Sequence, residues 1–511
     1  MAVKSLLLLS LSFWFAAPVW AASDRARARR SYEHALEAYL KGDFKQSLSE
    51  VNDAVEDDES LEVAFALRAR IWHVFGDIPL MQRDADRVAN QLVGSLSTLN
   101  EEELVAYGSV LLLRGQTEHA LPAFNAALQI NTNSVEALVG RARVWRAKGQ
   151  HDRALADLNE AIRRKKKIPL YHYNRANALY DLGRYDEAIS DLTAALRVHK
   201  RFYPAFGLVG ATLARKGDFK RALAAYNKAA NINPAYSFAY LGRAALRLSQ
   251  GQEDLAFSDF EEAIRINGHD YAGYFNRAEA YWRRGNREES TEDYRRALKA
   301  VNLDAEYAIK IGDRLTQLTL WKEAIAAYTQ AYVLAGGEND RSTTYSLPAD
   351  KANSPFRTGS KPLAPKALVV RSKITLSAFG IRALVHRALA YEGVKDTERA
   401  MLDLNEAVDR DPASAQAWAA RGSLALKLGL DEQALRDLTQ AVKIDPRDAA
   451  VRVARGSYYA RTNRPKHALD DFTAAIEADP RNAEAYNNRG ALWTNAFNEL
   501  EKAHADIGRA L

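Results

Sequence analysis

The side chains best suited to interact with one another in this sequence are arginines and aspartates at a fixed separation. An arginine at position i is followed by an aspartate at i+16 in Arg68 and Asp84, Arg141 and Asp157, Arg175 and Asp191, Arg243 and Asp259, Arg277 and Asp293, Arg387 and Asp403, Arg421 and Asp437, and Arg455 and Asp471. Arg489 and Asp506 are one position further apart, and His34 with Glu50 keeps the same signs. Because a guanidinium and a carboxylate match as bidentate partners, the series predicts repeated structural ion pairs, about half buried. The alternative interpretation is a set of solvated charges of fitting sign.

The remaining polar residues predict no catalytic or metal site. The chain has no cysteine, so disulfides, thiolate metal sites and thiol nucleophiles are excluded. Phosphate-binding loops, zinc-protease helices, calcium loops and hydrolase nucleophile elbows are all missing from the sequence. The histidines are scattered, and the net charge of +6 is small for 511 residues. We therefore expect no enzyme, no cofactor and no nucleic-acid partner.

The elements that would position the charged pairs follow from a spacing of glycines. Gly115, Gly149, Gly183, Gly217, Gly251 and Gly285 recur at a constant interval, each at i+34 from the one before, and an alanine follows each of them at i+12. Glycine tolerates the left-handed backbone that ends many helices. The segments on either side, such as Tyr171–Leu182 and Asp186–Leu196, have apolar residues at helical spacing. Each period is therefore predicted to be two helices joined at the glycine.

The repeat also indicates how the charges pair. Three units lack both members of the pair and carry Tyr107 with Ala123, Val209 with Ala225, and Ile311 with Ala327. If each aspartate bound the arginine of the following unit, Asp191 would face Val209 and Asp293 would face Ile311. We therefore predict that each pair joins the two helices of one unit.

These features resemble the tetratricopeptide repeat family. The unit 271–304 fits the family pattern with Tyr274, Ala278, Tyr281, Tyr294 and Ala297, and the unit 415–448 fits it with Trp418, Gly422, Ala434, Ala441 and Pro446. The resemblance covers almost the whole chain and implies an all-α, right-handed superhelical solenoid of about 13 helix-turn-helix units. It also implies a non-catalytic scaffold that binds a protein or an extended peptide in its concave groove.

In the resembled family, one stripe of each first helix lines that groove. Here the stripe gives these candidate partner-binding residues: Arg143, Arg146, Tyr173, Asn177, Tyr180, Phe275, Glu279 and Trp282. Aromatic side chains beside arginine and asparagine suit a protein or peptide partner. The alternative is that the aromatics are buried against neighbouring helices. The clamp that some family members use for terminal carboxylates is not expected, because Val139 stands where it needs lysine.

The chain ends and one interruption set the expected domains. Residues 1–22 have the layout of a secretory signal peptide, which predicts export across the inner membrane to the periplasm; an uncleaved anchor is the alternative. Degenerate repeat units follow at 23–100, seven units at 101–338, and four units at 381–511. Residues 339–380 break the pattern and are predicted to be an insertion, with a β-prone run at 368–376.

Two other functions remain open at this point. The basic run Arg163, Arg164, Lys165, Lys166 and Lys167 is either a favourable charge at a helix C-terminus or a contact for an anionic surface. The second interpretation would make the chain a glycan- or membrane-surface-binding accessory module of the cell envelope. The third possibility, an enzyme with its site at the insertion, would require polar groups of residues 339–380 to converge on the array.

Overall fold

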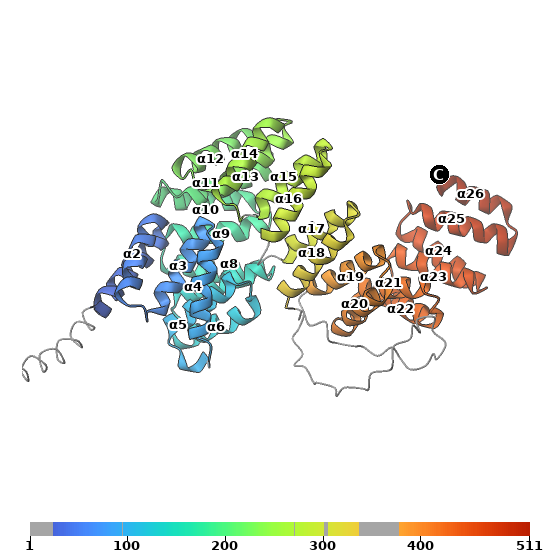
Figure 1. Ribbon diagram of the computed structural model, residues 1–511, viewed down its shortest axis with the longest axis horizontal. Coiled ribbons are helices and arrows are strands. Elements are labelled where there is room, and N and C mark those ends of the chain that lie inside the picture. Colours follow the sequence, from blue (N-terminus) through green and yellow to red (C-terminus); the bar gives the residue numbers. More distant parts are fainter. Residues whose placement is uncertain (1–23, 95, 270, 301–304, 337–377, 511) are drawn as a thin grey trace, which may run out of the picture. The chain divides into compact units, whose positions relative to one another are not determined.

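The computed structural model describes residues 24–94, 96–269, 271–300, 305–336 and 378–510. The chain divides into two compact units, Met1–Leu303 and Asp304–Leu511. In both units the described residues form successive pairs of helices joined by short turns (Figure 1). This confirms the prediction of an all-α helix-turn-helix solenoid. The signal segment at 1–22 and the β-prone run at 368–376 lie outside the described residues.

The first unit begins with the helical residues 24–41. Its further helices are α2 (Phe44–Asp57), α3 (Glu62–Phe75), α4 (Ile78–Gln91), α5 (Glu101–Leu113), α6 (Thr117–Ile130), α7 (Val135–Ala147), α8 (His151–Arg164), α9 (Pro169–Asp181), α10 (Tyr185–Val198), α11 (Tyr203–Arg215), α12 (Phe219–Ile232), α13 (Ser237–Ser249), α14 (Glu253–Ile266), α15 (Tyr271–Arg284) and α16 (Arg287–Ala300). A short 3-10 turn, η1 (Leu96–Thr98), precedes α5.

Helix boundaries follow from local chemistry. Pro169 occupies the first turn of α9, where its missing N–H costs nothing. At the other end Gly183 takes a φ of +73°, and the N–H groups of Gly183 and Arg184 donate to Tyr180 and Leu179. This is the hydrogen-bond pattern that closes many helices at a left-handed glycine. The same turn recurs at the other glycines of the series, so the glycine spacing sets the length of each pair.

The first helix of each pair lies on the inner side of the array. First helices of successive pairs, such as α11 and α13 or α13 and α15, contact one another, whereas second helices of successive pairs scarcely touch. The alanines and glycines of the repeat lie where helices cross. A Cβ placed on Gly140 would come within 2.2 Å of the Phe124 ring, so only glycine permits this approach.

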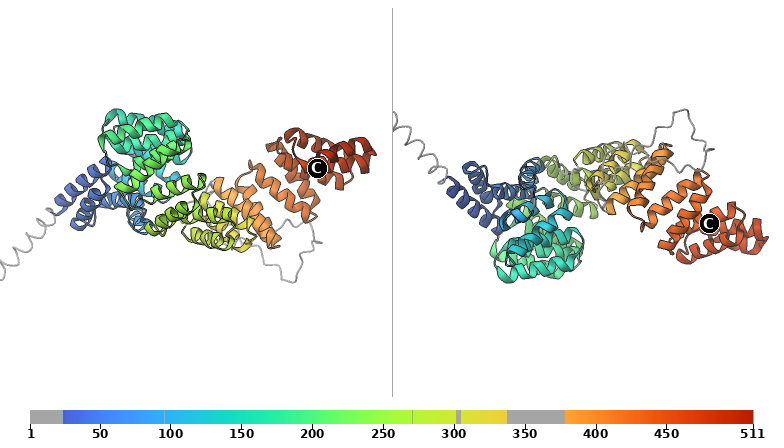
Figure 2. Two further views of the ribbon diagram at one scale, coloured as in Figure 1. Left: turned by 90° about the horizontal axis from the view of Figure 1, so that it is seen from above. Right: turned by 90° about the horizontal axis from the view of Figure 1, so that it is seen from below.

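The N-terminal pair of helices, residues 24–57, packs against helices far along the chain (Figures 1 and 2). The ring of Phe44 lies 6.1 Å from the rings of both Phe202 and Tyr203. Gly42 has a φ of +86°, and a Cβ there would lie 2.6 Å from Phe202. One hydrophobic cluster therefore runs from Tyr32 to Leu208, and it closes the first superhelical turn on itself.

The second unit contains α17 (Ala305–Gln317), α18 (Trp321–Leu334), α19 (Ala378–Gly393), α20 (Thr397–Arg410), α21 (Ala415–Lys427), α22 (Asp431–Ile444), α23 (Ala449–Arg461), α24 (Pro465–Ala478), α25 (Ala483–Leu492) and α26 (Leu500–Ala510). The extra residue of the last pair is accommodated by a π-helical turn, Trp493–Phe497, which ends at Asn498 in the left-handed region. Asp506 thereby regains its place opposite Arg489.

The helices before and after the interruption are direct neighbours. Helix α18 packs along α19, and the Tyr332 hydroxyl donates to the Glu406 carboxylate at 2.6 Å. The Arg387 guanidinium donates to the Thr329 hydroxyl at 3.2 Å. The pair before residues 337–377 thus stacks directly on the pair after them. The predicted domain limits at 339 and 380 stay a prediction.

The closed turn predicts that a substitution at Phe202 destabilises the N-terminal helices that pack on it. Phe202 is fully buried, so Phe202→Ala should remove packing worth about 3–5 kcal/mol. In hydrogen-exchange mass spectrometry, protection of residues 24–57 should fall, although these residues are distant from Phe202 in sequence. As a control, Phe260→Ala removes an equally buried ring and should leave residues 24–57 unchanged. Unaltered exchange of 24–57 in the Phe202 variant would contradict the closure.

Candidate partner-binding groove and the ion pairs that shape it

Each predicted arginine lies against the aspartate of its own unit. In the pair on α15 and α16, Arg277 Nε lies 2.6 Å and Nη2 lies 2.9 Å from the two carboxylate oxygens of Asp293. The same bidentate contact is made by Arg68 with Asp84, Arg141 with Asp157, Arg175 with Asp191, Arg243 with Asp259, Arg387 with Asp403, Arg421 with Asp437, Arg455 with Asp471, and Arg489 with Asp506. His34 is 3.8 Å from Glu50.

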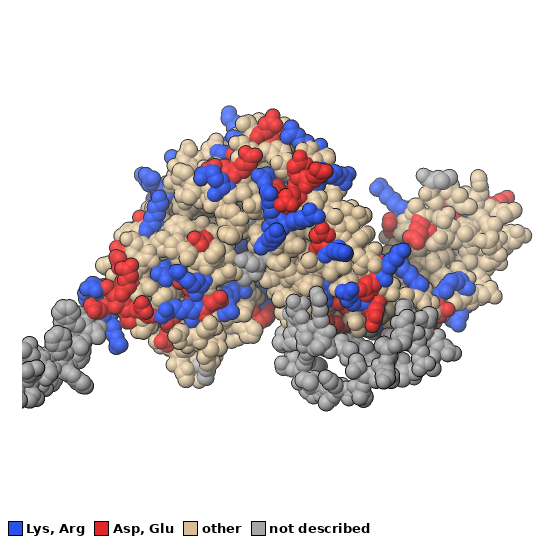
Figure 3. All heavy atoms as spheres, viewed as in Figure 1, with Lys and Arg blue, Asp and Glu red and all other residues tan. Residues whose placement is uncertain are grey.

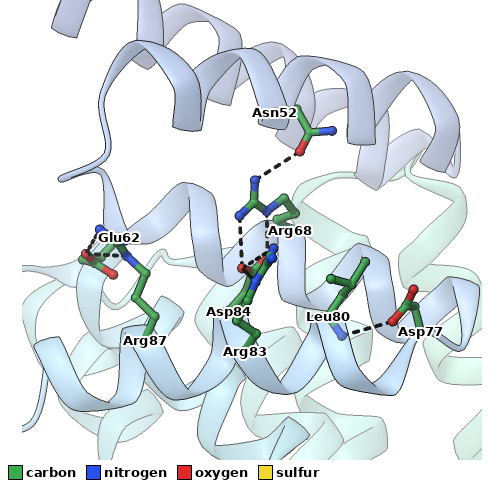
Figure 4. A network of polar contacts seen from close by, with 8 residues as sticks. All are labelled: Asn52, Glu62, Arg68, Asp77, Leu80, Arg83, Asp84 and Arg87. Atoms are coloured by element: carbon green, nitrogen blue, oxygen red, sulfur yellow. Dashed lines mark hydrogen bonds and ion pairs between the residues drawn. The ribbon is translucent and has the colours of Figure 1, made fainter.

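Most of these arginines also hold a third helix. Figure 4 shows Arg68 between Asp84 of its own pair and Asn52 of the preceding pair, whose side-chain oxygen accepts from Nη1 at 3.2 Å. The corresponding acceptors are Asn125 for Arg141, Asn159 for Arg175, Asn227 for Arg243, Asn405 for Arg421, Thr329 for Arg387, and Thr473 for Arg489. The guanidinium therefore joins two pairs as well as two helices.

This third contact was missed from the sequence, although the sequence carries its signal. Except across the insertion and in the last unit, the acceptor precedes the arginine by the same separation at which the aspartate follows it. A search for polar residues that accompany the arginine would have found the series.

Burial makes the pairs costly to break. The aspartates are at most 8% exposed, and Asp293 is 2% exposed. Burial raises the pKa of the Asp191 carboxyl, but hydrogen bonds from Arg175 and His172 outweigh it and hold the pKa below its ordinary value. The hydrogen bond to Asp191 in turn raises the pKa of the Arg175 guanidinium. At Asp403 burial prevails and raises the pKa of the carboxyl despite the hydrogen bond from Arg387.

His172 adds a titratable contact to one of these pairs. Its Nδ1 lies 3.2 Å from Asp191 Oδ1, and its Nε2 lies 3.0 Å from the backbone oxygen of Lys166. The hydrogen bond to Asp191 raises the pKa of His172 above its ordinary value, against the opposing effect of burial.

The candidate groove residues at α7 and α9 face the closed turn. Tyr173 is half buried, with its ring 5.5 Å from the Phe202 ring. It therefore packs against a neighbouring helix, which is the alternative that the sequence left open for the groove aromatics. Asn177 donates to the backbone oxygen of Tyr173 at 2.9 Å and is turned onto its own helix. Arg146 forms an ion pair with Asp181 at 2.6 Å. Arg143 is half buried and has no carboxylate partner in the described residues.

Tyr180 lies at the C-terminal end of α9. Its ring is 5.8 Å from the ring of Tyr185, and its hydroxyl accepts from Arg215 Nε at 3.3 Å. It therefore links α9, α10 and α11 and is only half exposed.

The candidate groove residues on α15 form a separate group. Phe275 lies edge-on to Tyr294 at 5.8 Å, and the Tyr294 hydroxyl donates to Glu279 at 2.7 Å. The Arg287 guanidinium stacks over the Trp282 ring at 4.0 Å, which leaves the tryptophan half exposed. The structure therefore separates the predicted groove into an inner set on α7 and α9 and a more open set on α15.

Helix α13 extends the open set with apolar residues that were not selected from the sequence. Phe238 is 43% exposed, and Leu241 and Leu248 are half buried on the same stripe. Leu241 and Leu248 have the helix positions of Phe275 and Trp282, Phe238 lies one helical turn before Leu241, and α13 contacts α15. Applying the stripe rule to every unit would have found them. We call Phe238, Leu241, Leu248, Phe275 and Trp282 the apolar stripe.

The basic run ends α8 and is partly neutralised. Arg163 and Arg164 both bind Glu160 at 2.6 Å, and Arg164 also donates to the backbone oxygen of Thr132 at 2.9 Å. Lys165, Lys166 and Lys167 are exposed. On the face drawn in Figure 3, positive and negative side chains lie interspersed over both units.

Among the described residues there is neither a candidate metal site nor a candidate membrane-spanning helix. No group of three or more histidine, aspartate or glutamate side chains there is arranged to hold a metal ion. Within the same residues, no helix has the length and apolar character needed to cross a membrane.

Sequence comparison matches two family models to the chain. The tetratricopeptide repeat model matches residues 173–238, 275–339, 386–449 and 453–511. The model of the anaphase-promoting complex, cyclosome, subunit 3 matches residues 113–195. No curated protein matches the chain significantly.

Solved structures with similar folds are also repeat proteins. A tetratricopeptide repeat protein from Parabacteroides merdae is 18% identical, with 54% of this chain and 94% of that chain covered and a TM-score of 0.36. One from Thermus thermophilus is 24% identical, with 36% and 99% covered and a TM-score of 0.34. YrrB, described as having an unusual peptide-binding site, is 19% identical, with 34% and 88% covered and a TM-score of 0.27. The likeness concerns the fold alone.

A double-mutant cycle measures the value of one ion pair. Because Asp293 is buried, Arg277→Ala and Asp293→Ala should each lower the free energy of unfolding by about 3–5 kcal/mol, with the double variant losing much less than the sum. Urea unfolding followed by circular dichroism gives the four values. The exposed pair Lys41 and Glu37 is the control, and Lys41→Ala should cause no measurable change. Additive losses at Arg277 and Asp293 would contradict the interaction.

The raised pKa of His172 gives a pH dependence. Protonated His172 stabilises the fold fully below its unfolded pKa of about 6.5, and this contribution is lost as the pH rises through the higher folded pKa. Stability should therefore decline from about pH 6 to about pH 8, and His172→Gln should flatten that decline. Urea midpoints at the two pH values test this. His119→Gln, at an exposed position, should keep the native slope, and an unchanged slope in His172→Gln would refute the assignment.

Proposed function

The chain belongs to the tetratricopeptide repeat family, and we propose on that basis that it is a non-catalytic scaffold that holds a protein or an extended peptide in its groove. Proteins of this family generally mediate interactions between proteins. We propose no catalytic role, because the recurring arginines and aspartates form ion pairs between helices.

The observation that supports a groove partner is the apolar stripe on α13 and α15. Phe238 remains 43% exposed on α13, with its ring 5.7 Å from the ring of Tyr236. Trp282 is half exposed in the same stripe, with Arg287 stacked on it. Aromatic anchors beside arginine are enriched in protein interfaces, where they bury much area at a low entropic cost. The stripe therefore fits a partner with apolar side chains.

We also propose that the scaffold works in the periplasm. This rests on the sequence of residues 1–22, whose short positive start, apolar centre and small residues suit a secretory signal. The partner would then be a protein or peptide of the cell envelope.

The glycan- or membrane-surface alternative has less support. It depends on Arg163–Lys167, of which Arg163 and Arg164 are held by Glu160. The enzyme alternative depends on residues 339–380, most of which lie outside the described residues.

A capture experiment with a groove variant tests the proposal. The purified chain should capture an envelope protein that the double variant Phe238→Ala with Trp282→Ala does not. Loss of two interface anchors at about 2 kcal/mol each, about 4 kcal/mol together, should weaken binding by about 700-fold. Mass spectrometry identifies the captured protein, and titration with it gives the two affinities.

Two comparisons complete the test. Phe219→Ala removes a ring that is 41% exposed at the start of the second helix α12, and it should bind the partner as the native chain does. Binding should survive high salt. Equal capture by the groove variant, or binding that collapses with salt and depends on Lys165, Lys166 and Lys167, would reject the groove in favour of a surface-binding module.

A further inference from the structure

A cavity lies in the first unit between the helical residues 24–41 and helices α3, α5 and α7. Its volume is about 330 Å³, at the lower end of the roughly 300–1,000 Å³ that small-molecule pockets enclose. It contains none of the apolar stripe, so it is a separate feature from the proposed groove site. Charged side chains of both signs line it: Arg29, Arg70, Glu101, Glu102 and Glu136.

Two of these five charges neutralise each other. The Arg29 guanidinium donates to both carboxylate oxygens of Glu102, at 2.6 and 3.0 Å. Such a bidentate contact satisfies both groups. The remaining charges of the cavity are therefore one guanidinium and two carboxylates.

Arg70 is the guanidinium without a carboxylate partner. It is half buried, stacks over the Tyr39 ring at 4.4 Å, and forms no ion pair with any described residue. Its Nε is buried and has no hydrogen-bond partner among those residues. Other half-buried arginines of the first unit, such as Arg141 and Arg247, lie 2.7 Å from an aspartate oxygen. The positive charge of Arg70 thus faces the cavity unmatched.

Glu101 and Glu136 are the unmatched negative charges. Both are half buried in the first turn of their helices, α5 and α7, where the helix dipole favours a carboxylate. Each accepts a hydrogen bond from a neutral group, Glu101 from the Asn131 amide at 2.8 Å and Glu136 from the Tyr171 hydroxyl. Neither forms an ion pair within the described part of the chain.

Opposite charges that line one cavity without touching select a ligand that carries both signs. A carboxylate alone would meet the repulsion of Glu101 and Glu136, and an ammonium group alone would meet that of Arg70. A small zwitterion satisfies all three side chains at once, which lowers the cost of their burial.

The rest of the wall indicates what else the ligand carries. Apolar side chains face the same cavity, and two of them, Val63 and Leu67, are only 5% and 2% exposed. Leu36 and Val105 complete this wall. Such a surface favours an apolar group, because its burial removes hydrocarbon area from water.

We propose that this cavity binds a free α-amino acid with an apolar side chain. The Arg70 guanidinium binds the carboxylate of the ligand, and Glu101 and Glu136 bind its ammonium group. The apolar wall takes the side chain. The inference goes beyond the scaffold proposal, since it gives the chain a small-molecule ligand in addition to a protein partner.

Isothermal titration calorimetry of the purified chain with leucine and three relatives tests the site. Isocaproate lacks the ammonium group, isoamylamine lacks the carboxylate, and glycine lacks the apolar side chain. Leucine should bind, and each relative should bind at least about tenfold more weakly, because each loses one of the three sets of contacts.

Two variants assign the charges to the two ends of the ligand. Arg70→Gln should weaken leucine binding at least about tenfold and bind isoamylamine no worse than the native chain does. The double variant Glu101→Gln with Glu136→Gln should also weaken leucine binding, but should bind isocaproate no worse than the native chain. A variant that had merely unfolded would lose every ligand.

Matched controls remove the same charges elsewhere. Lys220→Gln removes a positive charge at an exposed position, and Glu288→Gln with Glu289→Gln removes two exposed carboxylates from the first turn of α16. Both controls should bind leucine as the native chain does. In hydrogen-exchange mass spectrometry, saturating leucine should slow exchange in α3 and α5 and leave α13 unchanged.

The outcomes are independent of the scaffold proposal. Absence of leucine binding, equal binding of leucine and its relatives, or binding that both cavity variants leave unchanged overturns the amino-acid site. Protection by leucine on α13 in place of α3 and α5 also overturns it. Partner capture that depends on Phe238 and Trp282 would stand in each of these cases, and leucine binding would stand if that capture failed.

Discussion

The buried bidentate contact between one arginine and one aspartate is the interaction on which the array depends. Arg277 and Asp293 illustrate it, since removing either side chain would leave the other buried without its partner. The same guanidinium donates backward to an asparagine or threonine in most units, as Arg141 does to Asn125. In those units one side chain thus joins its own two helices to the preceding pair. The units that carry Tyr107, Val209 and Ile311 instead form their helix pairs by packing alone.

That constraint explains which arginines have structural roles. The arginines of the interhelical pairs bind aspartates within the fold, so they are not available to bind a partner. Arg70 and Arg143 lie at the same position of their first helices as Glu279 and take no part in these interhelical pairs. A similar division applies to the aromatic rings: Phe124 and Phe202 are sealed between helices, while Phe238 stays 43% exposed. Recognition in this chain is therefore expected only where the repeat leaves a group unmatched.

Much of the fold followed from the sequence, because the relevant contacts are local. The glycine spacing predicted the helix pairs, and the constant separation between the two charges predicted which arginine meets which aspartate. Both depend only on geometry inside one unit. The longer separation between Arg489 and Asp506 indicated an extra residue in the last unit but did not show where it lies. In the structure a π-helical turn accommodates it. The exposed Phe238 was overlooked because the stripe was examined in only some of the units, although the rule that selected Trp282 applies to it equally.

The closed first turn lay beyond such reasoning for a physical reason. Phe44 meets Phe202 through the accumulated rotation of the intervening pairs, and no repeat position encodes that sum. The consequence for the groove is direct. Tyr173, a good interface residue by type, packs on Phe202 and so contributes to the core of the turn. Trp282 has the same aromatic character on α15, outside the hydrophobic cluster that closes the turn, and stays half exposed. Both residues were selected by their type. Only the long-range contact with Phe202 determines which of them stays exposed to a partner.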